Sequence, residues 1–143
     1  MFSKLRRWLT RLRKHQPAAG RLTMRQVRGQ AGERLACGLL RRHQYIIEAT
    51  NVRFPVGELD VVAQDGATLC FVEVRSQTTG RFGVAAESVT VTKQQRLSRA
   101  AQWYLKRRRP AWEGPVRFDV VAIDTQAGKP FPKLIQNAFG LNW

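Results

Sequence analysis

The chain has 143 residues, with 25 Lys and Arg against 10 Asp and Glu, which gives a formal net charge of +15. This length suggests one domain with a real core, and the charge predicts a polyanionic partner, nucleic acid before an anionic membrane. Two cysteines and two histidines are too few for a disulfide framework, a zinc site or a histidine-based nuclease. No apolar run is long enough for a membrane span and no signal peptide is evident, so we expect a cytoplasmic protein with buried, reduced thiols.

Residues 1–26 are interpreted as a basic extension, and residues 27–143 as the folded α/β domain. The first 29 residues carry nine basic side chains and no acid. Apolar residues recur there at helical spacing: Phe2, Leu5, Leu9 and Leu12. Two interpretations stay open, an amphipathic helix that forms on a polyanion or membrane surface, and a mobile basic tail in the free protein.

The first helix is predicted from Val27 to His43. Its apolar face consists of Ala31, Leu35, Leu39 and Leu40. Its only acid, Glu33, either pairs with a surface arginine or points inward. A strand is predicted over residues 45–49, and residues 51–56 are interpreted as a connection because they contain Pro55.

A β-hairpin follows, and it carries three of the ten acidic residues. Residues 58–64 and 67–75 are rich in β-branched and aromatic side chains, and Asp65-Gly66 between them is a strong hairpin signal. Strand alternation then places one set of apolar side chains in the core: Leu59, Val61, Ala63, Cys70, Val72 and Val74.

Charged side chains share the other face of this hairpin. With a two-residue turn, Asp60 lies opposite Phe71. Glu58 then lies opposite Glu73, and Arg75 projects from the same face. Opposed like charges destabilise a strand pair, so this face needs a counter-ion, either an arginine or a divalent cation bound through oxygens. A loop of odd length would instead put Asp60 and Glu73 on opposite faces.

Residues 76–87 have the composition of a loop, and a second helix is predicted to follow. The helix begins at Thr92, whose spacing to Gln95 matches a capping box, and stops before Pro110. One side of it is basic and carries an exposed tryptophan: Arg96, Arg99, Trp103, Lys106 and Arg107. This side suits phosphate contact and base stacking, although a solvated face that covers the core edge explains it equally well.

Two further segments complete the chain. Residues 117–123 are predicted to form a strand in which Arg117 and Asp119 make a structural pair, and residues 131–143 form a closing strand or packed coil. The order of elements implies a mixed sheet flanked by helices, which is an α/β domain. Clustered carboxylates without histidine, in a cationic surround, suit metal-assisted phosphodiester hydrolysis with Mg²⁺ or Mn²⁺.

Four segments carry a resemblance to a known family: Gly57-Glu58-Leu59-Asp60, Phe71-Val72-Glu73-Val74-Arg75, Lys93, and Arg117-Phe118-Asp119-Val120-Val121. In their order and spacing the chain resembles the YraN family of small bacterial endonuclease-like proteins. That family is similar to archaeal Holliday-junction resolvases and to the PD-(D/E)XK nuclease superfamily. The resemblance implies a restriction-endonuclease-like fold and a metal-dependent endonuclease that acts on DNA, including branched or junction DNA.

The resemblance also implies roles for individual residues. Asp60 is the motif aspartate, Glu73 the second acid, Glu33 the helix-borne acid, and the main-chain carbonyl of Val74 an added metal ligand. Arg75 departs from the family pattern, because the superfamily usually has Lys there and Arg cannot act as a base. Arg75 can still orient a phosphate, and Lys93 either supplies the missing amine or only contacts phosphate.

Three hypotheses for function stay open. The intact cluster of Glu58, Asp60 and Glu73 favours the endonuclease, whereas Arg75 favours a non-catalytic module that binds DNA or RNA. A peripheral membrane protein explains the basic start but not the hairpin. Resolvases of this fold are commonly dimers, because two symmetric strands need two active sites, so the resemblance makes a homodimer one expectation.

Overall fold

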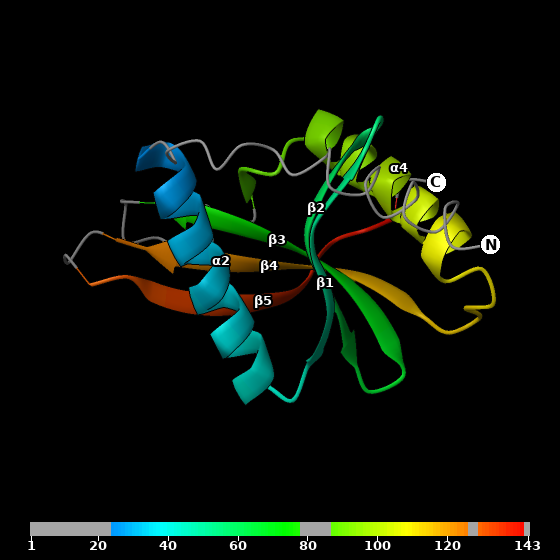
Figure 1. Cartoon of the computed structure of the whole chain (residues 1–143), viewed down its shortest axis with the longest axis horizontal. Coiled ribbons are helices and arrows are strands. Elements are labelled where there is room, and N and C mark those ends of the chain that lie inside the picture. The colour runs from blue at the N-terminus through cyan, green and yellow to red at the C-terminus, as the bar shows by residue number, and fades with distance from the viewer. Residues whose placement is uncertain (1–23, 78–86, 126–128, 142–143) are drawn as a thin grey trace, which may run out of the picture.

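The computed structural model describes residues 24–77, 87–125 and 129–141 (Figure 1). In chain order the elements of these residues are α2 (Met24–Arg42), β1 (Ile46–Phe54), β2 (Gly57–Asp65), β3 (Thr68–Gln77), α4 (Val91–Arg108), β4 (Val116–Asp124) and β5 (Phe131–Phe139). The strands form one sheet in the order β1-β2-β3-β4-β5. Only β3 and β4 pair in parallel, because α4 forms the crossover between them. This mixed sheet confirms the α/β prediction and is compatible with a restriction-endonuclease-like domain.

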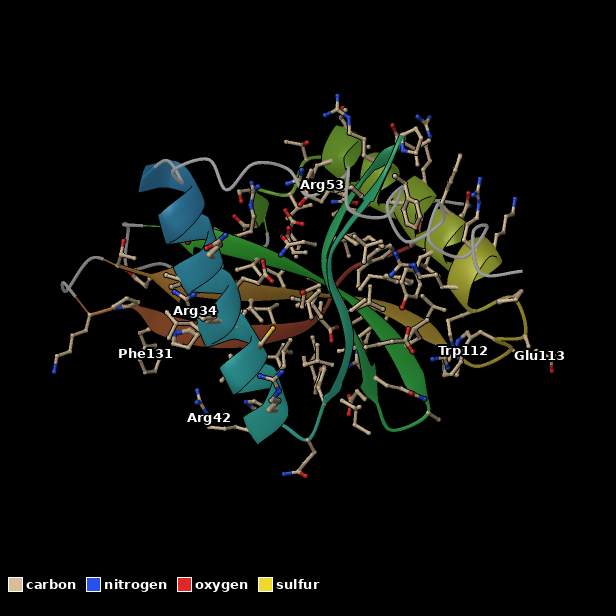
Figure 2. The ribbon with its side chains drawn as sticks, in the orientation of Figure 1. Arg34, Arg42, Arg53, Trp112, Glu113 and Phe131 are labelled. Carbon is tan, nitrogen blue, oxygen red and sulfur yellow. The ribbon has the colours of Figure 1, made fainter. Side chains whose placement is uncertain are left out.

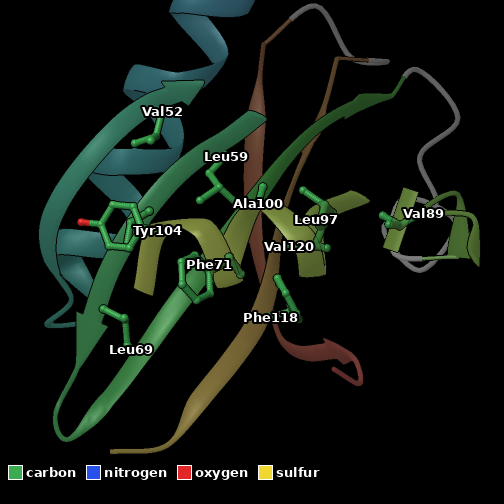
Figure 3. Close-up of a cluster of buried hydrophobic side chains, with 12 residues drawn as sticks. Val52, Leu59, Leu69, Phe71, Val89, Leu97, Ala100, Tyr104, Phe118 and Val120 are labelled. Atoms are coloured by element: carbon green, nitrogen blue, oxygen red, sulfur yellow. The ribbon is translucent and has the colours of Figure 1, made fainter. Parts of the chain in front are cut away.

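Helix α4 covers one face of the sheet. Its buried side chains include Leu97, Ala100, Ala101 and Tyr104 (Figure 3). They pack against apolar residues of the sheet, and the ring centroid of Phe71 lies 5.8 Å from that of Tyr104 and 5.8 Å from that of Phe118. Such aromatic contacts add to the stabilisation from burial, so this cluster anchors α4 across β2, β3 and β4.

Helix α2 covers the opposite face. Its cluster contains Ala36, Cys37, Leu39, Leu40, Val61, Ala63, Cys70, Val72, Val121 and Ile123. At Gly32 an added Cβ would lie 3.3 Å from Ile123 Cδ1, so glycine is what lets α2 approach β4 closely at this point. Cys37 and Cys70 are buried and form no disulfide, which confirms the prediction of buried thiols.

The β2–β3 hairpin is therefore buried on both faces, which the sequence prediction missed. Val62 and Leu69 are fully buried on the α4 side, although only the opposite face was predicted to be core. Leu59 also packs in the α4 cluster and not with Val61, because the β1–β2 hairpin bends toward α4 (Figure 1). An added Cβ on Gly57 would lie only 3.2 Å from the carbonyl oxygen of Arg96, which marks this close approach.

The turn of the β2–β3 hairpin lies one residue later than predicted. Asp65 pairs with Thr68, so Gly66-Ala67 forms the turn, and Gly66 has a φ of +57° that glycine adopts without strain. Phe71 accordingly lies opposite Val62 and not opposite Asp60. This displacement by two residues keeps Asp60 and Glu73 on a common face, because side chains alternate with a period of two.

Other boundaries also differ from the prediction. Strand β1 runs on to Phe54, so the connection predicted over residues 51–56 is reduced to a turn at Pro55 and Val56. Helix α4 is capped by Thr90 and not by Thr92, since Thr90 Oγ1 accepts a hydrogen bond from the Lys93 amide at 3.2 Å. Of the two alternatives for residues 131–143, a closing strand or packed coil, the structure has the strand, β5, over Phe131–Phe139.

The predicted extension over residues 1–26 lies outside the described residues except at its end, since α2 already begins at Met24. The described part of the chain contains no helix that is both long enough and apolar enough to cross a bilayer.

Candidate functional site

Asp60 on β2 and Glu73 on β3 lie together, as the sequence predicted. Their carboxyl groups share a hydrogen bond, and Asp60 Oδ2 also accepts one from the main-chain N–H of Val74 at 2.9 Å. Glu73 is almost completely buried, with 6% of its surface exposed, whereas Asp60 is half-buried. The hairpin pairing brings the two acids together, because Val61 pairs with Val72 immediately beside them.

Two cations approach this carboxylate pair. Lys93 Nζ, on the first turn of α4, lies 3.5 Å from Glu73 Oε1, and Arg75 Nη1 lies 3.9 Å from the same atom. Arg75 is held mainly by Ser88, because its guanidinium donates to the Ser88 carbonyl oxygen at 3.2 Å and to the hydroxyl at 3.1 Å. Lys93 is therefore the amine nearest to Glu73 among the described residues, and α4 supplies it.

Burial, followed by the negative charge of Asp60, raises the pKa of Glu73 from its ordinary value of 4.5 to about 8. Lys93 and Arg75 act in the opposite direction and lower the pKa, but they do not outweigh burial. Like charges this close cannot both ionise without cost, so the raised pKa favours the protonated form of Glu73 at neutral pH.

A cavity of about 680 Å³ opens beside Asp60. Its lining comes from α2, β1, β2 and β3: Gly29, Gln30, Gly32, Glu33, Asn51, Arg53, Glu58, Asp60, Val74 and Ser76. Figure 2 shows Arg53 in the space between α2 and the β1–β2 hairpin. Four of the predicted site residues thus line one cavity, and Glu73 lies just behind Asp60.

Glu33 lines this cavity from α2, but it does not touch the Asp60–Glu73 pair. Its Oε1 accepts a hydrogen bond from Asn51 Nδ2 at 2.9 Å. Glu58, at the cavity rim, lies 3.6 Å from Arg53 Nε in an exposed ion pair. Of the two predicted alternatives for Glu33, a surface pair with an arginine or an inward orientation, the structure therefore shows the inward orientation.

Asn51 is a cavity residue that the sequence reasoning missed. It lies within β1 with a φ of +50°, a left-handed backbone that is uncommon for any residue except glycine. Asn tolerates this region better than most residues, and non-glycine residues in it cluster at functional sites. No sequence signal identified Asn51, because the segment was interpreted as a connection.

The donor set at this cavity fits a hard divalent cation such as Mg²⁺ or Mn²⁺ in its chemistry. Asp60 and Glu73 offer carboxylate oxygens, and Val74, on the same strand as Glu73, lines the cavity. Among the described residues no three acidic, histidine or cysteine side chains gather closely enough to form a metal cluster. Any metal would thus depend on the two contacting acids together with main-chain or water oxygens.

The basic side of α4 is only partly as predicted. Arg96, Arg99, Lys106 and Arg107 are exposed. Trp103 is half-buried and not exposed, because its ring lies 5.9 Å from that of Phe54, and the Arg107 guanidinium lies 4.9 Å from its centroid. The sequence could not show that the β1–β2 hairpin would reach this tryptophan.

Arg117 and Asp119 form the structural pair that was predicted. Arg117 Nε donates to Asp119 Oδ1 at 2.8 Å, and Asp119 is completely buried. Tyr45 donates to Asp119 Oδ2 at 2.8 Å, and Arg117 also reaches Asp65 at 2.8 Å. This network ties β4 to the end of β2 and lies apart from the cavity, since none of its members lines it.

Comparison with known proteins identifies the family. The model of the uncharacterised protein family UPF0102 matches residues 32–123. A UPF0102 protein of Symbiobacterium thermophilum is 46% identical over 112 residues, which cover 78% of this chain and 94% of the relative. UPF0102 proteins of Desulfosudis oleivorans and Pseudomonas aeruginosa are 42% and 43% identical, over 85% and 78% of this chain and 96% and 91% of the relatives. The chain therefore belongs to family UPF0102, which is the YraN family that its sequence resembles.

Proposed function

We propose that this protein is a metal-dependent endonuclease that hydrolyses phosphodiester bonds in DNA. The observation that carries the proposal is the contact between Asp60 and Glu73 at the wall of an open cavity. A net charge of +15 favours polyanionic partners, yet the chain keeps an acidic pair in which burial, and then the charge of Asp60, raises the pKa of Glu73. Such a pair is costly unless a cation binds it, and phosphodiester hydrolysis is a reaction that a bound divalent cation assists.

Each residue of the cavity has a role in this proposal. Asp60, Glu73 and the Val74 carbonyl would hold the cation, which supplies Lewis acidity and lowers the pKa of a bound water. The Val74 amide orients Asp60 by its hydrogen bond. Lys93 and Arg75, which lie 3.5 Å and 3.9 Å from Glu73, would offer positive charge to the phosphate. Glu33 and Glu58 line the same cavity and would bind further waters or orient the metal-bound ones.

DNA is the preferred substrate in this proposal, with RNA second. The exposed basic side of α4 begins at the same turn that carries Lys93, so one helix would contact both the phosphate backbone and the acidic pair. Action on branched DNA, a homodimer and a cytoplasmic location remain proposals that follow from the family resemblance and the composition.

The test is a cleavage panel with linear, flapped, four-way-junction and RNA substrates, each with Mg²⁺, with Mn²⁺ and with chelator. We expect cleavage that needs a divalent cation and that falls by about 100-fold or more in Asp60→Asn and Glu73→Gln. DNA affinity in both variants should stay the same or rise, because negative charge is removed. Glu113→Gln, at an exposed position in the α4–β4 connection, is the matched control and should cleave like the wild type.

If Asp60→Asn and Glu73→Gln both cleaved DNA at the rate of the wild type, the assignment of the site would be wrong. Binding without cleavage of any substrate would favour the second candidate function, a DNA- or RNA-binding module. The feature that favours this candidate is Arg75, which stands in the usual lysine position and is held by Ser88.

A further inference from the structure

A second hollow lies on the outer side of α4, away from the acidic cavity. It has a volume of about 240 Å³ and is lined by Trp103, Lys106 and Arg107. These three residues are spaced by three and four positions, so they project from one side of the helix. The cavity and this hollow share no lining residue.

The β1–β2 hairpin stands between the two. Arg53 and Asn51 of β1 line the acidic cavity, while Phe54, the next residue along, packs its ring against Trp103. The bend of this hairpin toward α4 brings its other side to the helix (Figure 1). A strand of DNA that leaves the acidic cavity across the hairpin would therefore meet the Trp103 hollow.

Among the described residues, no acidic side chain forms an ion pair with the cations of this hollow. All ten acidic residues lie within the described part of the chain, and neither Lys106 nor Arg107 forms an ion pair with any of them. Cations in the last turn of a helix stabilise its C-terminus, which would explain basic residues there in general. That effect does not explain why the half-buried indole ring of Trp103 lines the hollow together with them.

We infer that this hollow binds an unpaired base of single-stranded DNA next to the position of cleavage. Trp103 would stack on the base, and Arg107, which now lies over the indole ring at 4.9 Å, would move to the base's other face or to its phosphate. Lys106 would contact the backbone. The inference rests on the proposed action on DNA, and it adds that the substrate carries a single-stranded flank.

Binding is measured by fluorescence anisotropy with chelator present, so that no cleavage is required. The probes are an oligothymidine of about 15 nucleotides and a blunt duplex of the same length. Trp103→Ala should weaken binding of the oligothymidine by about 10-fold and leave duplex binding within about 2-fold. Trp103→Phe should restore most of the loss, because a phenyl ring also stacks.

Arg107→Ala and Arg108→Ala form a matched pair of controls, since both remove one charge from the last turn of α4. Arg107 lines the hollow, whereas the Arg108 guanidinium lies over Tyr104 at 5.6 Å. Arg107→Ala should affect the single strand more than the duplex, and Arg108→Ala should affect both equally. Equal effects of all three alanine variants on both probes would overturn the inference.

Crosslinking tests the same site without any substitution. Oligothymidine carrying one 5-iodouracil should, on irradiation of the wild-type protein, attach to the α4 peptide that contains Trp103. Crosslinks confined to other peptides would contradict the inference. Because neither measurement depends on a metal, a failure of the nuclease proposal would appear in the cleavage panel alone.

Discussion

Two effects oppose ionisation of Glu73, and they make its titration visible in the stability of the protein. Burial and the charge of Asp60 raise its pKa in the folded chain to about 8, from an ordinary value of 4.5. The folded state therefore holds a proton that the unfolded state releases. The contribution of Glu73 to the free energy of unfolding is therefore fully present below pH 4.5 and is lost as the pH rises toward 8.

Glu73→Gln should accordingly stabilise the metal-free protein at alkaline pH. Gln resembles the protonated acid, so the variant and the wild type should have the same melting temperature near pH 4.5. Above pH 8 the melting temperature of the variant should be higher than that of the wild type by at least about 2–4 °C. Thermal melting with chelator across this range measures the difference. Added Mg²⁺ should then stabilise the wild type at pH 8 but not the variant, because only a carboxylate pair binds the cation well.

The exposed residue Glu113 again supplies the control, and Glu113→Gln should show no such pH-dependent gain. If the difference between Glu73→Gln and the wild type were the same at both ends of the range, Glu73 would not be the group that titrates.

Asn51 combines a left-handed backbone with a hydrogen bond to Glu33, and two substitutions separate these features. Asn51→Gly removes the amide and tolerates the backbone, whereas Asn51→Ala removes the amide and also strains the backbone. We expect Asn51→Ala to be less stable than Asn51→Gly by about 1 kcal/mol in urea denaturation. Both should lower metal-dependent cleavage to a similar degree, since both release Glu33.

Glu33→Gln and its combination with Asn51→Gly provide the check on this positioning role. If Asn51 acts through Glu33, the combined variant should cleave no more slowly than Glu33→Gln alone. Multiplicative losses, or full activity in Asn51→Gly, would show that Asn51 does not act in this way.

At the scale of single elements, α4 connects the acidic pair to the basic surface. Its first turn carries Lys93, which contacts Glu73, and its buried side anchors the sheet through the cluster in Figure 3. The exposed side is thereby held in a fixed position relative to the cavity. In the proposed function, phosphate contacts along α4 would position DNA at the carboxylates.

Arg96→Ala combined with Arg99→Ala should flatten the plot of log affinity for duplex DNA against log salt by about two units, because fewer counterions are released. The matched control is Arg41→Ala with Arg42→Ala, which removes the same charge from exposed positions at the end of α2. Fluorescence anisotropy over a series of salt concentrations measures both slopes. If both pairs of substitutions reduced the slope equally, the effect would depend only on the net charge, and α4 would not be part of the DNA interface.

At the scale of the whole molecule, the described residues form one sheet with α2 over one face and α4 over the other. Helix α2 with β1–β3 encloses the acidic cavity, and α4 presents the basic side on the other face. A far end of the sheet is tied together by Arg117, Asp119 and Tyr45. The packed core and the buried polar network stabilise the fold, and this stabilisation offsets the unfavourable clustering of acids at the cavity.

Local pattern in the sequence was sufficient for the element types, because hydrophobic periodicity and turn residues act over a few positions. The strand character of residues 117–123, the two helices and the β2–β3 hairpin all follow from such patterns. Even with the turn misplaced by one residue, Asp60 and Glu73 kept their common face, since the pairing of the strands shifted by two residues and side chains alternate with that period. The acidic pair was thus predictable from hairpin geometry.

Tertiary packing decided the rest, because it joins residues that no local pattern connects. Only the bend of the β1–β2 hairpin toward α4 brings Phe54 to Trp103, and only the crossover through α4 brings Lys93 to Glu73. The cavity itself needs α2 to pack against the sheet, with Gly32 in close contact with β4 and Asn51 holding Glu33. Contacts between distant segments depend on how whole elements pack, and residue spacing along the chain does not encode that packing directly.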